Sequence, residues 1–328
     1  MLMIKGNSSL KNKMFEIEAA LSLSEPLPTV DVWLVLDLLR ASTTIVSWFE
    51  RGGKELYPEM SIDSALSLKE RMLKEGYLPL LMGEKNSVPP DGFDAGNSPL
   101  EIDEQMTSRR PTAIMATTNG TKAILKAVST GAAVYIVCAR NALFALDSAI
   151  TKGRHIGILC AGRLGRPGVD DTICAGLLIE KLCGFLPDCV MSDGAVIAHN
   201  AWKNSMGSFE HNIRTAVHAK FLEKIGFGRD ISYACEQDRS VYVPEVKEVA
   251  DFCDSGLRPI ITCESKGGLK FLTHDAVPSG RSEERIIDEE KEKKATGTKD
   301  IFFGGNSYMR SKKLSNRNLD LDFGGGKD

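Results

Sequence analysis

Short apolar runs alternate with amphipathic segments along the central part of the chain. Continuous apolar runs predict strands covered on both faces, as in a parallel sheet; they lie at 32–36, 78–82, 113–116, 134–137 and 156–159. Segments with helical spacing of apolar residues predict helices at 41–51, 62–74, 121–128, 173–182 and 211–225, and Gly52, Gly76, Gly184 and Gly226 close four of them. This alternation predicts a layered α/β/α fold with a mostly parallel sheet. Two similar subdomains with the site between them are an open variant of that fold.

The two ends of the chain differ from its centre. Residues 1–13 are polar without a clear period, and we expect a flexible N-terminal segment there. We place the folded domain at 14–255. Residues 256–328 contain a long charge run and several glycine clusters, which bury too little apolar surface to offset the entropy of ordering. We therefore expect a mostly disordered C-terminal tail.

Composition narrows the classes of protein. Apolar residues make up 42% and charged residues 26% of the chain, as in globular proteins, and the net charge is −3. Without a basic excess, non-specific nucleic-acid binding is not expected. No apolar run approaches the ~20 residues that span a bilayer, and none at the start suits a signal peptide. We expect a cytoplasmic protein that binds neither nucleic acid nor membrane, and a homo-oligomer stays open.

Polar, chemically capable residues follow four of the predicted strands. Asp37 and Arg40 follow the first, Glu84 the second, and the run 117–121 the third, while Cys160 begins a loop rich in charge after 156–159. Ligands of open α/β sheets sit beyond the carboxyl ends of the strands. This coincidence of polar residues with strand ends favours a functional site there.

Two loops have the character of anion sites. Ser98 and Glu101 form a capping-box pattern that predicts a helix starting at Ser98, and the run 118–121 precedes another helix. Helix N-termini present free N–H groups to anions. Neither loop matches a nucleotide phosphate loop or a dinucleotide loop. The expected partner is therefore a small anionic phosphate ester, and an oxidoreductase is disfavoured.

Several carboxylates are candidate ligands for Mg²⁺, which binds through one or two carboxylates plus substrate phosphate. The candidates are Asp37, Glu84, Asp170, Asp171 and Asp193. Helix capping is the alternative role for the residues at helix starts, such as Asp171. Asp37 is different, because it ends a buried strand and Arg40 follows before the next helix.

Cys160 and Arg166 have the Cys-x5-Arg spacing of cysteine-dependent phosphatases. Leu159 replaces the usual preceding histidine, and Pro167 stands where those enzymes carry Ser or Thr. Nearby acidic residues would also repel a thiolate unless a cation lay among them. These features favour a metal-assisted route, although Cys160, Asp37 and a water molecule beside the cation all remain candidates for the attacking group.

Together the motifs resemble the 2-phosphosulfolactate phosphatase family over about 30–250. They are the runs 37–44, 83–84, 96–99, 117–121 and 160–162, followed by Asp171 and then by Ser192-Asp193. The resemblance implies an Mg²⁺-dependent acid phosphatase of coenzyme M biosynthesis, which converts 2-phosphosulfolactate to sulfolactate and phosphate. It also makes His218 the best functional candidate among the histidines.

The site hypothesis assigns three roles. The proposed catalytic residues are Asp37, Arg40, Cys160 and Asp171. The proposed substrate-binding residues are Asn97, Ser98, Thr118, Asn119, Gly120, Thr121, Arg163, Arg166 and His218. The proposed metal ligands are Asp37, Glu84, Asp171 and Asp193. The alternatives are a cysteine-dependent phosphatase using Cys160 and Arg166, and a non-catalytic anion-binding or scaffold protein.

Overall fold

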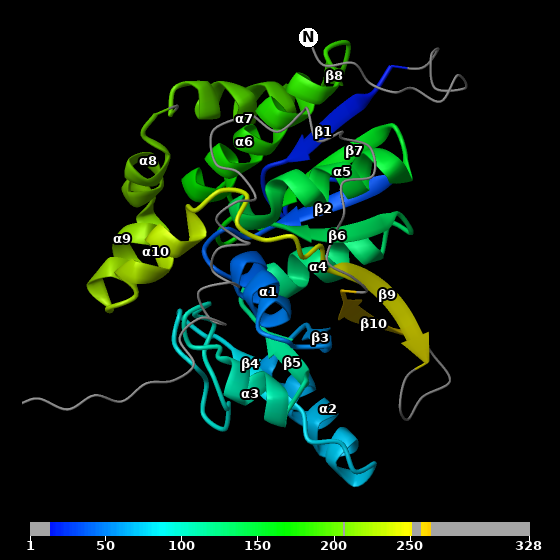
Figure 1. Ribbon diagram of the computed structural model, residues 1–328, viewed down its shortest axis with the longest axis vertical. Coiled ribbons are helices and arrows are strands. Elements are labelled where there is room, and N and C mark those ends of the chain that lie inside the picture. The colour runs from blue at the N-terminus through cyan, green and yellow to red at the C-terminus, as the bar shows by residue number, and fades with distance from the viewer. Residues whose placement is uncertain (1–13, 206, 251–256, 264–328) are drawn as a thin grey trace, which may run out of the picture. The chain divides into compact units, whose positions relative to one another are not determined.

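The computed structural model describes residues 14–205, 207–250 and 257–263, which fold into layers of helices on a mixed sheet (Figure 1). The strands are β1 (Glu16–Ala20), β2 (Val32–Leu36), β3 (Glu55–Glu59), β4 (Leu80–Gly83), β5 (Thr112–Ala116), β6 (Ala133–Val137), β7 (His155–Cys160), β8 (Val190–Met191), β9 (Glu245–Ala250) and β10 (Leu257–Thr262). The five strands predicted from apolar runs correspond to β2, β4, β5, β6 and β7. The expected α/β fold with a mostly parallel sheet is confirmed.

The helices follow the strands in the expected alternation. They are α1 (Ala41–Glu50), α2 (Ile62–Lys74), α3 (Glu104–Arg109), α4 (Gly120–Val128), α5 (Ala142–Lys152), α6 (Val169–Phe185), α7 (Asp193–Lys203), α8 (Phe209–Thr215), α9 (Val217–Lys224) and α10 (Gly228–Ala234), with a 3-10 turn, η2, at Ala139–Asn141. Gly52 and Gly76 end α1 and α2 with positive φ, as predicted. Gly184 instead lies inside α6, and the helix predicted at 211–225 is broken at Ala216 into α8 and α9.

The sheet consists of two parallel blocks joined by an antiparallel hairpin. The strand order is β4-β5-β3-β10-β9-β6-β2-β7-β1-β8, and the three pairings that involve β9 or β10 are the antiparallel ones. We call β4-β5-β3 the first block and β6-β2-β7-β1-β8 the second block. Each block meets the hairpin through two residue pairs, such as Val134 with Val246. The similarity of two subdomains stays a prediction.

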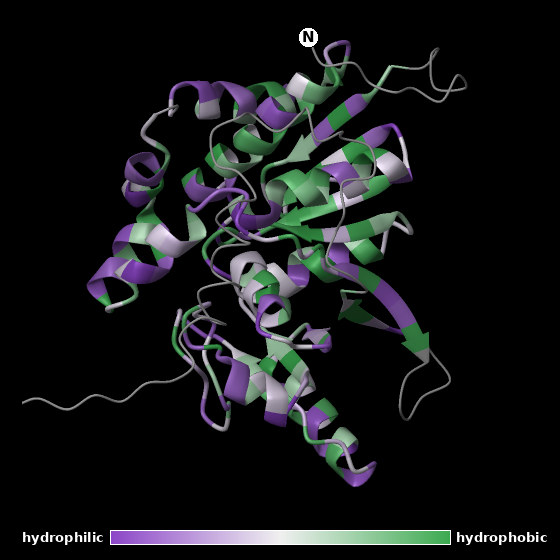
Figure 2. Cartoon of the chain, in the orientation of Figure 1, coloured by the Kyte–Doolittle hydropathy of each residue, from purple (hydrophilic) through white to green (hydrophobic). Residues whose placement is uncertain are grey.

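Both faces of β2 are buried, which explains its unbroken apolar sequence. Val32, Leu34 and Leu36 pack in one hydrophobic cluster with residues of α5 and α6, whereas Trp33 and Val35 pack in a second cluster with α1 and α4. Figure 2 shows the same contrast, with hydrophobic residues along β2 and more hydrophilic residues along β9. The layered arrangement therefore follows from covering each strand on both sides.

Helices α1 and α4 are shared between the two blocks. Their cluster contains Trp33 of the second block together with Leu56, Met82 and Met115 of the first block, and Figure 1 shows both helices between the two sets of strands. In a flat sheet the three antiparallel pairings would place the carboxyl ends of the blocks at opposite edges. The blocks turn relative to one another around the shared helices, because residues beyond the carboxyl ends of both line one pocket.

The folded part extends beyond the boundary that we set at residue 255. Strand β10 lies in the segment expected to be a disordered tail, yet it pairs with β9 and β3 inside the sheet. This strand is short and contains Pro259, so its own sequence gives no clear strand signal. Its apolar residues become buried only because β9 and β3 lie beside it. The N-terminal segment 1–13 and residues 264–328 of the predicted tail lie outside the described residues.

Most cysteines in the described part of the chain are packed inside the protein. Cys138, Cys160, Cys174 and Cys235 are buried, and the seven cysteines in the described part of the chain are free thiols. Within the same residues, no helix combines the length and the apolar character needed to cross a membrane.

Candidate functional site

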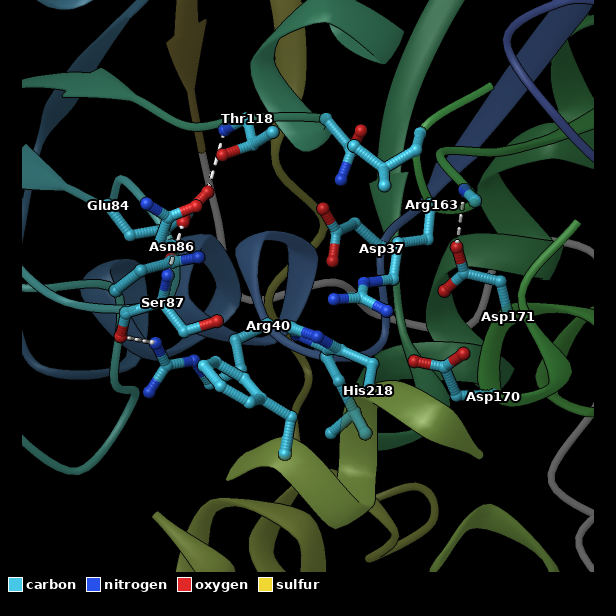
Figure 3. Close-up of a pocket in the computed structure, with 16 residues that line it drawn as sticks. Asp37, Arg40, Glu84, Asn86, Ser87, Thr118, Arg163, Asp170, Asp171 and His218 are labelled. Carbon is cyan, nitrogen blue, oxygen red and sulfur yellow. Dashed lines mark hydrogen bonds between the residues drawn. The ribbon is translucent and has the colours of Figure 1, made fainter. Parts of the chain in front are cut away.

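A pocket of about 320 Å³ lies where the loops after β2, β4, β5 and β7 meet helices α6 and α9 (Figure 3). Glu84 and Thr118 of the first block line one side, and Asp170 and Asp171 of α6 line the other, with Asp37 between them. Residues far apart in the sequence therefore converge on one cavity, at the strand ends where the sequence predicted a site.

Asp37 occupies the centre of this arrangement. Its Oδ1 accepts a hydrogen bond from the amide of Ala41 at 3.2 Å, and its own amide donates to Oγ of Ser42 at 2.9 Å. A Cβ built on Gly120 would lie 2.6 Å from Oδ2 of Asp37, so only glycine allows α4 to begin this close. Burial, and then the negative charge of Asp170, raises the pKa of Asp37 to about 7.

Asp170 and Asp171 are in the first turn of α6. Burial raises the pKa of Asp170 to about 6. Asp171 accepts amide hydrogen bonds on both oxygens, from Leu38 at 2.8 Å and from Gly162 at 2.9 Å. Burial and the charge of Asp170 nevertheless raise the pKa of Asp171. Asp171 therefore ties the loops after β2 and β7 together, whereas Asp170 offers its carboxylate to the pocket.

Glu84 joins the two loops of the first block. Its Oε1 accepts from the amide of Thr118 at 2.7 Å, and its Oε2 accepts from the amide of Ser87 at 2.8 Å. Both carboxylate oxygens thus hold backbone groups, although the side chain still lines the pocket. Its first role in this geometry is to fix the loop after β4 against the loop after β5.

Arg40 is almost completely buried beside the pocket. Its Nη1 donates to Oδ2 of Asp230 at 2.8 Å, and its Nη2 donates to the carbonyl of Ser87 at 2.7 Å. The guanidinium lies over the ring of Phe227, with Cζ 4.5 Å from the ring centre. An arginine has five N–H donors, these two bonds engage two of them, and Arg40 also lines the pocket.

Arg163 and His218 complete the basic lining. Arg163 is exposed on its loop, and its charge opposes the rise in the pKa of Asp170. Burial, followed by the charges of Arg163 and Arg40, lowers the pKa of His218 to about 4, so its imidazole is neutral at neutral pH. Its Nδ1 is buried without a hydrogen-bond partner in the described part of the protein, which leaves that nitrogen for a ligand.

Three helices begin at the pocket. Their N-cap residues are Arg40 for α1, Asn119 for α4 and Gly168 for α6, and none of the three caps its helix with a side-chain hydrogen bond. Some first-turn amides are engaged locally, such as that of Thr121, which donates to Oγ1 of Thr117 at 3.0 Å. The positive ends of three helix dipoles still face one cavity, which favours an anionic ligand.

The predicted loop at 96–101 lies beside the pocket but does not open a helix. Residues 98–101 form turns, and α3 begins at Glu104 with Asp103 as its cap. The capping-box prediction was wrong. The carboxylate of Glu101 accepts a hydrogen bond from the amide of Gly96, and neither residue belongs to a helix. Asn97 lines the pocket, and its Oδ1 is buried without a partner among the described residues.

Six predicted residues are not among those that line the pocket: Cys160, Arg166, Asp193, Ser98, Gly120 and Thr121. Cys160 is buried in the core, and burial with the nearby charge of Asp171 raises the pKa of its thiol. Arg166 is exposed and closes a tight turn with Arg163, through backbone hydrogen bonds of 2.8 and 3.0 Å. Asp193 is exposed in the first turn of α7. Ser98 and Thr121 are buried behind the surface that the pocket presents.

Sequence reasoning missed several residues of the site. Asp170 is among the candidate ligands but has no role in the site hypothesis, and Ser87, Phe221 and Asp230 belong to none of its motifs. Asp230 is the clearest omission, because it contacts both Arg40 and Ser98. No local signal could have found it, since its partners are 190 and 132 residues away in the sequence.

The carboxylates fit a divalent cation. Asp37 and Asp170 are buried and line the same pocket, and the charge of Asp170 raises the pKa of Asp37, which is the situation that a bound cation relieves. No cluster of three acidic, His or Cys side chains suited to a metal forms within the described residues. Mg²⁺ needs only one or two carboxylates when a substrate phosphate supplies further oxygens, so this pair suffices.

The fold and the pocket define an α/β protein with a pocket at its strand ends that is lined by carboxylates and basic side chains. Comparison with known proteins agrees: a family model described as 2-phosphosulpholactate phosphatase matches residues 20–249. A relative from Thermus thermophilus is 35% identical over 225 residues, covering 68% of this chain and 91% of the relative. One from Deinococcus radiodurans is 34% identical over 229 residues, covering 70% and 92%.

Both relatives bear the name "Probable 2-phosphosulfolactate phosphatase". The match spans most of the described part of the chain and includes every pocket element from β2 to α9. This chain belongs to the 2-phosphosulfolactate phosphatase family.

Proposed function

We propose that the protein hydrolyses 2-phosphosulfolactate to sulfolactate and phosphate with the help of Mg²⁺. The observation that carries this proposal is the meeting of three helix N-termini with two buried carboxylates, Asp37 and Asp170, in one small pocket. Helix ends and arginines suit the anionic groups of such an ester. The place in coenzyme M biosynthesis that the family resemblance implies is part of the proposal.

The metal site in this proposal differs from the one expected from the sequence. Asp37 and Asp170 would hold the cation, because Glu84 and Asp171 each use both oxygens on backbone amides and Asp193 lies outside the pocket. Bound there, Mg²⁺ would offset carboxylate charge and polarise the phosphoryl group. Glu84 and Asp171 would support the site by fixing the loops.

The chain's own residues account for substrate binding. Arg163 and the free donors of Arg40 would bind the anionic ends of the ester, which carries more negative charge than a simple phosphate. The pKa of about 7 for Asp37 belongs to the metal-free protein, and Asp37 would be ionised when it holds the cation. Asp37 as nucleophile and water as nucleophile both fit this geometry, while the buried Cys160 is disfavoured.

The test is phosphate release by the purified protein from 2-phosphosulfolactate, with the phosphates of lactate and glycerate as competitors for specificity. We expect turnover of 2-phosphosulfolactate that disappears after chelation with EDTA and returns with added Mg²⁺. Full activity after thorough chelation would remove the metal from the proposal. Tight binding of the esters without turnover would instead indicate a non-catalytic anion-binding protein.

A further inference from the structure

We infer that Asp230 is a positioning residue that holds Arg40 and the turn at Asn97–Ser98 in place behind the pocket. This role rests on the proposed function, since it concerns how the same site receives its anionic ligand. Asp230 lies in α10, outside the pocket lining, and its side chain is 3% exposed. It therefore acts through other residues.

Both oxygens of Asp230 are engaged, each by a different part of the site. Oδ2 accepts from Nη1 of Arg40 at 2.8 Å, and Oδ1 accepts from Oγ of Ser98 at 2.7 Å. Arg40 follows β2 in the second block, whereas Ser98 belongs to the loop after β4 in the first block. One carboxylate thus fixes the two blocks relative to α10 at the point where the pocket forms.

The contact with Arg40 continues into the pocket wall. Nη2 of Arg40 donates to the carbonyl of Ser87, and the amide of Ser87 donates to Glu84, which also accepts from Thr118. Asp230 therefore anchors a chain of hydrogen bonds that runs from Arg40 to Glu84 and Thr118 on one side of the cavity. Loss of the anchor would allow the guanidinium to move and would loosen the loop that carries Ser87.

Charge explains why a carboxylate is needed at this position. The guanidinium of Arg40 is buried, with 1% of its side chain exposed, and Asp230 forms an ion pair with it. A buried charge without a partner is strongly unfavourable, so without Asp230 the guanidinium would turn toward the acidic pocket. There the guanidinium would compete with Mg²⁺ for the carboxylates of the pocket. It would also no longer present its free N–H donors to the ester.

The contact with Ser98 acts on the neighbouring residue. Asn97 lines the pocket with a buried Oδ1 that lacks a partner within the described residues, and its carbonyl accepts from Oγ1 of Thr44 at 2.8 Å. Fixing Ser98 on one side and the Asn97 carbonyl on the other restricts the turn. The Asn97 side chain is thereby directed by the same carboxylate that directs Arg40.

Asp230→Asn is the main test, because it keeps the shape and an acceptor for Ser98 but removes the charge that pairs with Arg40. Supporting contacts of this kind cost ~10–100-fold when they are lost. We expect kcat/KM to fall by about that factor, mainly through a higher KM. Calorimetry should show a matching loss of affinity for inorganic phosphate in the presence of Mg²⁺.

Two further variants separate positioning from general stability. Ser98→Ala removes only the second contact, and we expect a smaller loss of roughly 3–10-fold in the same two measurements. Glu236→Gln breaks an ion pair with Arg140 near the end of α10 without touching a pocket residue. This control should keep both values within about twofold of the wild type, even if its melting temperature falls.

The outcomes distinguish this inference from the proposed function. Wild-type KM, kcat and phosphate affinity per folded molecule in Asp230→Asn would overturn the positioning role, whatever its melting temperature. If that variant does not fold, wild-type behaviour of Ser98→Ala in both measurements overturns it. If the wild type releases phosphate from no ester, the proposed function fails, and the phosphate affinities of the variants still decide the role of Asp230.

Discussion

Replacing Asp37 by asparagine should stabilise the metal-free protein at alkaline pH while abolishing turnover. Burial and Asp170 raise the pKa of Asp37 from 3.8 to about 7 in the folded state. A raised carboxyl pKa means that the folded protein binds the proton more tightly than the unfolded chain. The stability from this proton is fully present below pH ~4 and is lost as the pH rises through about 7.

The magnitude follows from the size of this change. A difference of about 3 pKa units at ~1.4 kcal/mol each gives ~4 kcal/mol of lost stability above pH 7. The asparagine side chain of Asp37→Asn would carry no charge. It would keep an oxygen that can accept the hydrogen bond that the amide of Ala41 now donates to Oδ1 of Asp37. At ~2–4 °C per kcal/mol for a domain of this size, the melting temperature should rise by roughly 8–16 °C at pH 8.

The assay is thermal unfolding in EDTA between pH 4.5 and 8.5, with wild type and Asp37→Asn measured side by side. The gap should be small at pH 4.5 and largest at pH 8. Asp193→Asn, which changes an exposed carboxylate outside the pocket, is the matched control and should show no such growth. Adding Mg²⁺ at pH 8 should raise the melting temperature of the wild type much more than that of Asp37→Asn. A gap of constant size across this range, or a less stable variant at pH 8, would refute the reasoning.

Two other substitutions test the remaining assignments. Cys160→Ser should lower turnover by no more than about threefold, because the buried thiol is kept protonated; a loss of several orders of magnitude in a phosphate-release assay would restore the cysteine mechanism. Gly120→Ala should reduce turnover at least ~10-fold and cost ~1–3 kcal/mol in denaturant unfolding, because its Cβ would lie 2.3 Å from that of Ala41 and 2.6 Å from Oδ2 of Asp37. Gly184→Ala, in α6 with no atom within 4 Å of the new Cβ, is the neutral control, and equal behaviour of the two variants would contradict the close-approach argument.

Local pattern predicted the elements whose signal is contained in their own residues. The five continuous apolar runs became strands because burial on both faces makes their pattern independent of distant partners. Strands β9 and β10 escaped prediction for the opposite reason. Glu245, Lys247 and Glu248 give β9 a polar sequence, and its pairing with β6 and β10 comes from the joining of two distant blocks.

The sequence by itself determined the chemistry available at the strand ends. Motif and position predict Asp37, Glu84, Asn97, Thr118, Asn119, Arg163 and Asp171, the family resemblance adds His218, and all of them line one pocket. Strand–helix alternation suffices for this, because it fixes which end of each parallel strand carries the functional loops.

Only the tertiary structure decided what each of these groups is free to do. Asp171 and Glu84 bind backbone amides with both oxygens, Cys160 is enclosed in the core, and Asp170 presents a carboxylate to the cavity. Asp230 contacts Arg40 from α10, 190 residues further along the chain. Hydrogen-bond partners and burial depend on how two blocks turn around α1 and α4, and no local pattern of residues encodes that relation.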